Sequence, residues 1–396
     1  MPLALESLTV IDLTQVMAGP YCCQLLGDLG ADVIKVEPHA GDATREATGH
    51  RLPAGTSAAF LAVNRNKRSI AINLREPSGR DALHRLVETA DIVVESFRPG
   101  VAKRLGADYA TLREINDQLV HASISGFGQT GPYAQRPGYD LIAQAMSGIM
   151  SVTGEATGAP TKCGVPVADL SAGLLCAVGI LSACLARTVT GRGQAVDTSL
   201  YDAALAMSVW ETAELWATGR PPDRLGSAHR VNAPYAAFPT RDGHLTIGAN
   251  NTRLWQRLCA VLDRPDLLAD PRFDTNTDRV THRDALAGEL AGTLSTRDTE
   301  EWVALLADAG VPAAPIRDYA QSCADPHTLA REMVVELDHP VEGPVRALGI
   351  PVKLSDTKGE IRRTPPDLGE HTDEILRAAG YSTEEIAALR AEGAVA

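Results

Sequence analysis

Short apolar segments alternate with helix-like segments over the first 125 residues, and this alternation limits the possible folds more than any other feature of the sequence. Each apolar segment is hydrophobic at consecutive positions, as in ADIVVESF at 90–97, so neither of its faces suits water. Strands of this kind are typical of parallel sheets that are covered by helices on both faces. We therefore predict an α/β fold with strands at 8–13, 31–37, 69–74, 90–97 and 119–125 and helices at 18–29 and 79–88.

The longest uncharged run, residues 170–186, has the composition of a buried helix. It is at the short edge of a membrane span, and glycines and serines interrupt its apolar residues. We predict a core helix over 171–185 and a second helix from about residue 199. The N-terminal segment MPLALESLTVIDLTQV lacks the basic start and long apolar stretch of a signal peptide, so we expect a cytoplasmic protein with no membrane partner.

The cysteines and the charge balance restrict the compartment and the partners. The seven cysteines are irregularly spaced and form no CxxC pair, which favours reduced thiols over a disulfide framework. The net charge of −13 disfavours a nucleic-acid partner, because phosphate backbones attract a basic excess. An anionic ligand therefore needs a locally basic cleft.

A change of composition divides the chain. The segment ATGRPPDRLGSAHRVNAP at 217–234 is rich in glycine, proline and arginine and is typical of a linker. It is followed by a smaller module that opens with a hairpin around Asp242 and Gly243, and the tail ends in two short helices. We predict a large domain that begins with 1–216, a linker at 217–234, a small domain at 235–310, and a second linker plus the rest of the large domain at 311–396.

The segment Gly126–Gly131 matches the dinucleotide-binding pattern GxGxxG after a predicted strand. That pattern needs a helix that opens at the glycines, but Pro132 and Pro137 interrupt the following turns, so we predict a plain turn. The ten histidines show no metal-binding spacing, and the sequence contains no GxSxG nucleophile elbow. The sequence therefore predicts neither a metal site nor a serine hydrolase.

Asp169 lies just before the predicted core helix and has two interpretations. An aspartate in this position is typically an N-cap, which accepts a hydrogen bond from the second or third helical N–H, and caps far outnumber catalytic carboxylates. A carboxylate at a helix N-terminus also stays ionised, because the aligned peptide dipoles favour its charge, and an ionised carboxylate can attack an activated acyl group. The two interpretations do not exclude each other.

Two groups of basic residues could hold an anion, one near the third predicted strand and one after the fourth. They are Arg65, Lys67, Arg68 and Arg75, and Arg98, Lys103 and Arg104. Ligands of α/β sheets bind beyond the carboxyl ends of the strands, which places Arg98 and Arg104 toward a phosphate. The alternative is a solvated basic surface, which is the more common environment of a single arginine.

Six segments, taken in order, carry a family resemblance that covers essentially the whole chain. They are DLTQVMAGPYCCQLLGDLGADVIKVEP, NRNKRSIAINL, ADIVVESFRPGVAKRLG, SGFGQTGPYAQRPGYDLIAQAMSG, GVPVADLSAGL and GRGQAVDTSLYDA. Together with the tail PPDLGEHTDEIL they resemble the class III CoA-transferases, which include formyl-CoA transferases and α-methylacyl-CoA racemases. The resemblance implies a Rossmann-like large domain made from both chain ends, a smaller inserted α+β domain, and an interlocked homodimer.

The resemblance also implies a mechanism and a binding site. Asp169 falls on the family's nucleophilic aspartate, which forms a mixed anhydride and then an aspartyl-CoA thioester. The substrates would be an acyl-CoA and a small carboxylic acid, with no permanently bound cofactor and no metal. Phe97 would pack on adenine, Arg104 would meet a phosphate, and Tyr139 would lie near the thioester. The family's CoA-contacting segments fall on Gln15, Val16, Ala18, Ile72, Asn73, Arg75, Ser96, Phe97, Arg98, Arg104, Tyr139 and Asp140.

Departures from the family pattern separate its branches. The racemases carry a histidine where this sequence has Tyr139, and a tyrosine is too weak an acid near neutral pH to replace it unless strongly perturbed. The formate and oxalate transferases carry a glutamine at Met17 and a glycine run at 247–251, and both are missing here. The segments Asn-Ala-Pro-Tyr and Ile-Gly-Ala-Asn resemble branches that use succinyl-CoA and small dicarboxylates, so we expect a transferase that uses succinyl-CoA and a short carboxylic or dicarboxylic acid. The alternatives are a racemase or epimerase and a non-catalytic CoA-binding protein.

Overall fold

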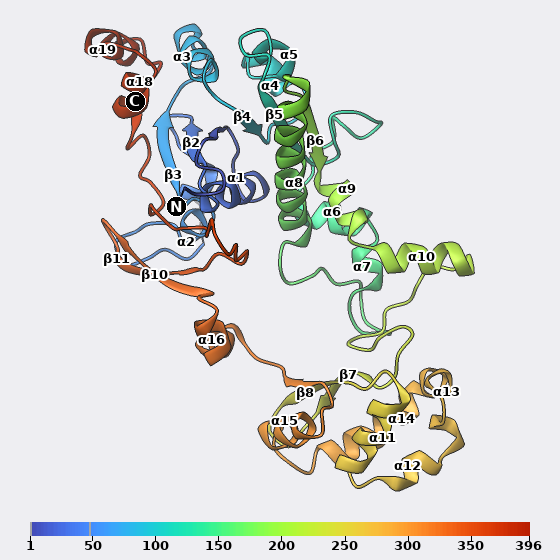
Figure 1. Cartoon of the computed structure of the whole chain (residues 1–396). Helices are drawn as coiled ribbons and strands as arrows, with labels where there is room; N and C mark the ends of the chain where they lie inside the picture. The colour runs from blue at the N-terminus through green and yellow to red at the C-terminus, as the bar shows by residue number, and fades with distance from the viewer. Residues whose placement is uncertain (1, 47–48) are drawn as a thin grey trace. The chain divides into compact units, whose positions relative to one another are not determined.

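The computed structural model describes residues 2–46 and 49–396, which divide into two compact units (Figure 1). Unit 1 comprises Met1–Ile149, Cys163–Ala217 and His327–Ala396, and unit 2 comprises Met150–Lys162 and Thr218–Pro326. Unit 1 therefore draws on both ends of the chain. The division into domains and linkers at residues 216, 234 and 310 stays a prediction.

A six-stranded sheet in the order β3-β2-β1-β4-β5-β6 forms the centre of unit 1, and all of its strand pairs are parallel. The predicted α/β fold with a large parallel sheet is confirmed. The sequence analysis missed the edge strand β6, whose exposed residues carry no continuous apolar run. The strands are β1 (Thr9–Asp12), β2 (Asp32–Glu37), β3 (Lys67–Ala71), β4 (Ile92–Glu95), β5 (Val120–Ser125) and β6 (Ala195–Ser199).

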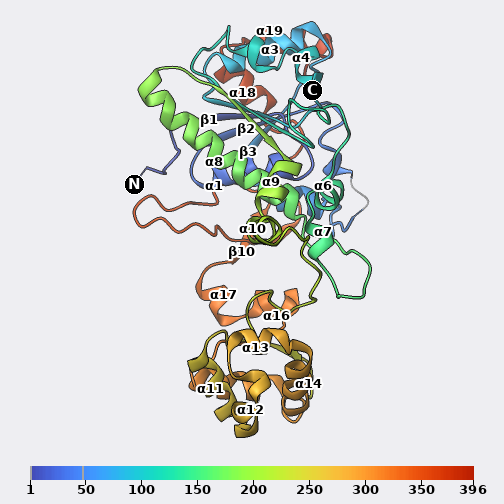
Figure 2. The ribbon, with the colours of Figure 1, turned by 90° about the vertical axis from the view of Figure 1, so that its right-hand side faces the viewer.

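Helices cover both faces of this sheet, as Figure 2 shows with the strands between them. Val10 and Val33 face α1 (Ala18–Asp28) and α8 (Val167–Thr190). Their neighbours Ile11 and Ile34 belong to the second core, which is completed by α3 (Pro77–Val87), α18 (Thr372–Ala378) and α19 (Thr383–Ala391). Because successive strand residues point to opposite faces, two buried faces require strands that are apolar at every position.

The remaining elements of unit 1 are one hairpin and several further helices. The hairpin consists of β10 (Val334–His339) and β11 (Gly343–Leu348), which pair antiparallel. The helices are η1 (Ala43–Arg45), α2 (Ala58–Ala62), α4 (Val101–Arg104), α5 (Tyr109–Leu112), α6 (Asp140–Met146), α9 (Leu200–Ala206), α10 (Val209–Thr218) and α17 (Pro326–Ala330). Helix α7 (Ile149–Val152) begins at the last residue of the first segment of unit 1, and its other residues belong to unit 2.

Helix α8 is long and apolar enough to cross a membrane by length and composition. In the structure one side of it packs on the sheet through small and apolar residues such as Ala172, Cys176 and Ile180. The predicted core helix is therefore confirmed, and it is longer at both ends than residues 171–185.

Unit 2 is built around an antiparallel sheet of β7 (Tyr235–Pro239), β8 (His244–Gly248) and β9 (Ala313–Pro315). The hairpin predicted around Asp242 and Gly243 joins β7 to β8 and is confirmed. Its core contains large side chains such as Trp255, Phe273 and Trp302. Its helices are α11 (Thr252–Val261), α12 (Pro265–Ala269), η2 (Pro271–Phe273), α13 (Asn276–Thr281), α14 (Arg283–Leu294), α15 (Thr299–Asp308) and α16 (Tyr319–Ala324).

Two fully buried lysines, Lys35 within β2 and Lys67 at the start of β3, lie among carboxylates beside the end of β1. Lys67 Nζ donates to Asp12 Oδ2 at 2.9 Å and to the Pro20 carbonyl at 3.0 Å. Lys35 Nζ donates to Asp42 Oδ2 and to the Thr14 carbonyl, both at 3.0 Å. Burial alone would raise the pKa of Asp12, but the charges of Lys67 and Lys35 outweigh it and lower that pKa to about 2. The lysines thus bind the backbone just after β1 and within α1.

We predict that Lys67→Met destabilises the protein by about 3–5 kcal/mol, because the buried Asp12 carboxylate loses its partner. The free energy of unfolding from urea denaturation at neutral pH measures this effect. Lys358→Met removes an exposed lysine and should change stability by about 0.5 kcal/mol or less. Equal effects of the two substitutions would contradict the prediction.

Candidate active site

The site lies where the strand order of the sheet reverses. Strand β1 pairs with β2 on one side and with β4 on the other, and ligands of such sheets bind beyond the carboxyl ends of the strands at this point. Two cavities open there. The Asp169 cavity has a volume of about 320 Å³, and the second, which we call the arginine cavity, has a volume of about 860 Å³. Gln15, Phe97 and Val101 line both, so the two cavities adjoin each other.

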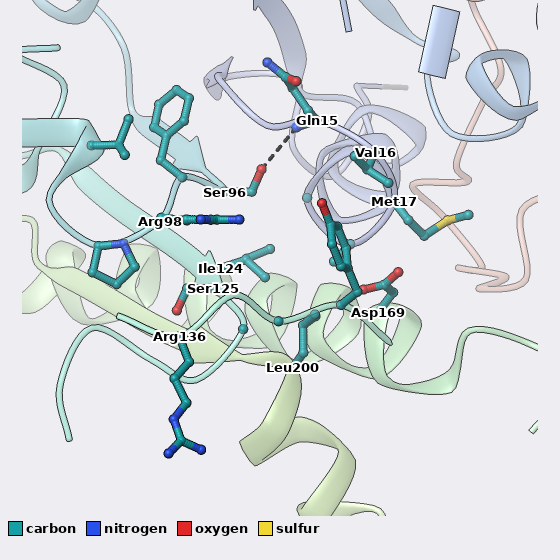
Figure 3. A pocket seen from close by; sticks show the side chains of 18 residues that line it. Gln15, Val16, Met17, Ser96, Arg98, Ile124, Ser125, Arg136, Asp169 and Leu200 are labelled. Carbon is teal, nitrogen blue, oxygen red and sulfur yellow. Dashed lines mark hydrogen bonds between the residues drawn. The ribbon is translucent and has the colours of Figure 1, made fainter. Parts of the chain in front are cut away.

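Asp169 is the third residue of α8 and lines the first cavity. Figure 3 shows it on the same side as Val16 and Met17, with Arg98 opposite. The capping interpretation was wrong, because α8 begins at Val167 and its N-cap is Pro166, without a side-chain cap. No hydrogen bond to the Asp169 carboxylate is recorded within residues 2–46 and 49–396. Burial, and then the negative charge of Asp140, raise the pKa of Asp169 to about 6.

The cap of α8 comes from another helix. Asp140 Oδ1, at the start of α6, accepts from the backbone N–H groups of Ala168 at 2.9 Å and Asp169 at 3.5 Å. Its Oδ2 accepts from Gln144 Nε2 at 2.7 Å, and Gln144 Oε1 accepts from the Cys163 N–H at 2.8 Å. A carboxylate at this helix terminus is favoured by the unsatisfied N–H groups and the helix dipole. Asp140 therefore positions Asp169 by binding the backbone at the start of α8, and it lines neither cavity.

The opposite wall is the start of α1, which lies against α8 because Gly173 has no side chain. A Cβ atom there would come within 2.6 Å of the Ala18 carbonyl oxygen, so any larger residue would push the helices apart. Before α1, Val16 adopts a left-handed φ of 73°, which is unfavourable for a β-branched residue. The Val16 N–H reaches Asp42 Oδ1 at 3.3 Å, and the Gln15 N–H donates to Ser96 Oγ at 3.1 Å. These bonds hold the strained turn in the wall that faces Asp169.

The structure distributes the predicted site residues over the two cavities. Asp140 was also predicted to contact CoA, but it lines neither cavity. The Asp169 cavity is lined by Gln15, Val16, Ala18, Ser96, Phe97, Arg98, Tyr139 and Asp169. The arginine cavity is lined by Ile72, Asn73, Arg75 and Arg104, with Gln15 and Phe97 shared. Residues from six separate segments therefore meet along one edge of the sheet.

Several lining residues were missed by the sequence analysis. Arg136 lines the Asp169 cavity and stacks over Tyr133, with its guanidinium carbon 3.8 Å from the ring centre. His39 and Arg80 line the arginine cavity. Arg136 lies only three residues before the predicted site residue Tyr139, so its position was accessible from the sequence. His39 follows β2, whose carboxyl end reaches the same edge of the sheet as the other lining loops.

The residues of the two predicted basic groups differ in whether they form ion pairs. Arg65 pairs with Asp28 at 2.6 Å, Lys67 pairs with Asp12, and Arg68 pairs with Asp32, so the prediction that these three hold an anion was wrong. By contrast, Arg75, Arg98 and Arg104 line the cavities and form no ion pair within the described part of the chain. Their charges remain available to an anionic ligand despite the net charge of −13.

The GxGxxG segment forms no pyrophosphate site of the dinucleotide type. Residues 126–139 contain no helix, which confirms the predicted turn. Gly126 lines the Asp169 cavity, and a Cβ atom on it would come within 2.9 Å of the Gly138 Cα atom. The glycines therefore allow two backbone segments to touch beneath the cavity. Among the described residues, no group of three or more histidine, cysteine, aspartate or glutamate side chains could hold a metal ion.

Comparisons with known proteins agree with one another. The model of the CoA-transferase family III matches residues 5–372. The chain is 40% identical to a succinyl-CoA:mesaconate CoA-transferase of Haloarcula hispanica, over 96% of this chain and 97% of that protein. It is 37% identical to a human succinyl-CoA:glutarate CoA-transferase, over 99% of this chain and 90% of that protein.

A solved structure shares the fold. The CAIB/BAIF family protein from Brucella suis superposes with a TM-score of 0.86 at 39% sequence identity, and the match covers 96% of this chain and all of that one. Since a family model spans nearly the whole chain and full-length relatives share more than a third of its residues, the chain belongs to CoA-transferase family III and is a class III CoA-transferase.

Proposed function

We propose that this enzyme moves CoA from an acyl-CoA donor, with succinyl-CoA as the first candidate, to a short carboxylic or dicarboxylic acid. The proposal depends on one observation, which is that the Asp169 carboxylate faces a cavity. Within the described part of the chain, no hydrogen bond is made to this carboxylate. The similar proteins named above act between succinyl-CoA and mesaconate or glutarate, which supports this choice of substrates.

The two cavities suggest how CoA lies on the sheet edge. Its phosphates are anionic, and Arg75 and Arg104 offer unpaired guanidinium groups in the arginine cavity. Phe97 lies between the cavities and offers a ring for the adenine base. The pantetheine arm would then pass Gln15 and bring the thioester to Asp169. In this arrangement the phosphates of CoA bind in the arginine cavity and the thioester reacts in the Asp169 cavity.

The proposed chemistry has four balanced steps. The Asp169 carboxylate attacks the thioester carbonyl, the C–S bond breaks, and CoA leaves as a thiolate from a mixed anhydride. The thiolate then attacks the aspartyl carbonyl and releases the donor acid, which leaves an aspartyl-CoA thioester. The acceptor carboxylate attacks that thioester, forms a new anhydride and frees the thiolate. The thiolate attacks the acceptor's acyl carbon, which yields the new acyl-CoA and restores the carboxylate.

A raised pKa suits this nucleophile. A carboxyl group with a pKa of about 6 is mostly ionised at pH 7, yet it is a better nucleophile than a carboxylate of ordinary acidity. Burial provides this increase and also keeps water away from the reactive anhydride. The N–H groups at the start of α1 lie in the facing wall, where tetrahedral oxyanions need donors.

The racemase alternative lacks a base in the Asp169 cavity. Proton exchange at an α-carbon needs a second group beside the aspartate, and no histidine is among the residues that line this cavity. Tyr139 takes the corresponding position and is 68% exposed to solvent. Transfer of CoA therefore fits the cavity better than racemisation.

The assembly that we propose is a homodimer located in the cytoplasm. The side of α8 turned away from the sheet exposes Leu174, Val178 and Leu185, with exposed fractions of 48%, 60% and 70%. An apolar face of this extent is typical of a surface that another chain covers. A second copy of this chain is the partner that the family resemblance implies.

We predict that light scattering gives twice the chain mass at micromolar concentration. Val178→Asp should lower the dimer fraction, because it places a charge on the apolar face of α8. The matched control is Val341→Asp, which changes an exposed valine in the turn between β10 and β11 and should leave the mass unchanged. A monomeric mass for the unmodified protein would contradict the proposed assembly.

We predict that Asp169→Asn lowers CoA exchange between succinyl-CoA and glutarate by roughly four orders of magnitude, because the nucleophile is lost. Hydroxylamine added during turnover should convert Asp169 of the unmodified enzyme into a hydroxamate, which peptide mapping by mass spectrometry detects. Enzyme incubated with succinate and free CoA is the control and should stay unlabelled. Undiminished exchange in the variant would disprove covalent catalysis by Asp169.

We predict that kcat/KM falls about tenfold per pH unit below pH 6, because the protonated Asp169 carboxyl group cannot attack. Asp140→Asn removes the like charge that raises the pKa of Asp169, so the acidic limb should move to lower pH. The asparagine oxygen can still accept the helix N–H bonds. Asp108→Asn, at the start of α5, makes the same charge change elsewhere and should leave the limb in place. A limb that does not move in Asp140→Asn would contradict this coupling.

A further inference from the structure

A buried glutamate without a cationic partner lies at the end of β4. Glu95 is 2% exposed, and no ion pair is recorded for its carboxyl group within the described residues. Its side chain bonds to Ser123 on the neighbouring strand β5, and the charged group that acts on it is Asp197 on β6, which repels it. Glu95, Ser123 and Asp197 occupy one row across three strands. A buried carboxyl group is costly to maintain, so its retention here calls for a role.

The carboxyl group of Glu95 shapes the segment that follows it. Its Oε2 atom accepts the Phe97 N–H at 2.6 Å, which closes a tight turn over Ser96. This turn aims Ser96 Oγ at the Gln15 N–H and places Phe97 between the two cavities. Arg98 then follows on the edge of the Asp169 cavity. Through its bond to the Phe97 N–H, Glu95 therefore positions Ser96, Phe97 and Arg98. Ser96 in turn holds Gln15.

We propose that Glu95 is a positioning residue for acyl-CoA binding, which acts through its bond to the Phe97 N–H. The proposal rests on the proposed function, because it takes the two cavities as the CoA site. Glu95 is not a catalytic residue, since it lines neither cavity. Its loss should weaken the binding of acyl-CoA and leave the acid substrate and the chemical steps largely unaffected.

The protonation of Glu95 adds a second, measurable effect. Burial, together with the weaker repulsion from Asp197, raises the pKa of Glu95 to about 7 although its hydrogen bonds oppose this. Bound CoA brings further negative charge to the same edge of the sheet and favours the neutral carboxyl group. Binding should therefore take up a proton near neutral pH, so the KM for acyl-CoA should rise as the pH increases through 7.

The test compares Glu95→Gln and Glu95→Ala with the unmodified enzyme, using succinyl-CoA and glutarate as substrates between pH 6 and 8. The glutamine keeps an oxygen for the Phe97 N–H and cannot ionise. Its KM for succinyl-CoA should stay within about twofold of the unmodified value at pH 6 and should lose the rise above pH 7. Alanine should raise that KM about tenfold at every pH, while kcat and the KM for glutarate change less than about threefold.

Two further variants control the comparison. Glu88→Gln removes an exposed charge after α3 and should leave every parameter unchanged. Asp197→Asn removes the repulsion on Glu95 and should move the pH dependence to lower pH, because Glu95 then ionises at lower pH and the KM begins to rise there. The titration of the CoA phosphates is common to all variants, so the difference between Glu95 and glutamine isolates this one group.

The proposal is overturned if Glu95→Gln retains the pH dependence of the unmodified enzyme, or if Glu95→Ala changes kcat and both KM values alike. If the alanine variant does not fold, the pH profile of the glutamine variant decides alone. The failure of the proposed function looks different: exchange then persists in Asp169→Asn, whatever the Glu95 variants do. Calorimetric titration with CoA gives the proton uptake directly and needs no turnover.

Discussion

The edge of the sheet that carries the site depends on two lysine charges that are buried among carboxylates. Lys35 and Lys67 are fully buried, and each binds one aspartate and one backbone carbonyl near the start of α1. Removing one partner from such a pair leaves an uncompensated charge in a low-dielectric interior, which costs far more than an exposed ion pair contributes. The strained turn at Val16 and the first residues of α1 are therefore held in one place, and they form the wall that faces Asp169.

The environment of Asp169 combines two opposing requirements. Its helix terminus needs an acceptor for free N–H groups, and Asp140 provides one, but the same carboxylate repels the Asp169 charge. The helix dipole alone would lower the pKa of Asp169, yet burial and Asp140 together raise it. The result is a carboxyl group that ionises about one unit below neutral pH. In the proposed mechanism this group is both charged and nucleophilic under physiological conditions.

Charge on the chain is distributed unevenly in a way that suits an anionic ligand. The protein has a net charge of −13, yet Arg75, Arg98 and Arg104 have no carboxylate partner in the described part of the chain. Among the nearby carboxylates, Asp12 and Asp42 pair with buried lysines, Glu37 pairs with Arg45, and Glu95 is partly protonated near neutral pH. A polyanion that approaches this edge therefore meets available positive charge before it meets carboxylates. This explains how an acidic protein can offer a site for CoA.

The sequence by itself determined the parts of the fold that local pattern controls. Runs of apolar residues gave the strands of the parallel sheet, and the uncharged run after Asp169 gave α8, because burial on both faces leaves no polar position. The family resemblance brought together residues that line both cavities. Only the tertiary structure decided which charges are free. Arg65 and Lys67 pair with aspartates 37 and 55 residues away, and Asp140 caps α8 from 28 residues away. No local pattern reports such partners, because hydrogen bonds and ion pairs depend on distance in space and not on distance along the chain.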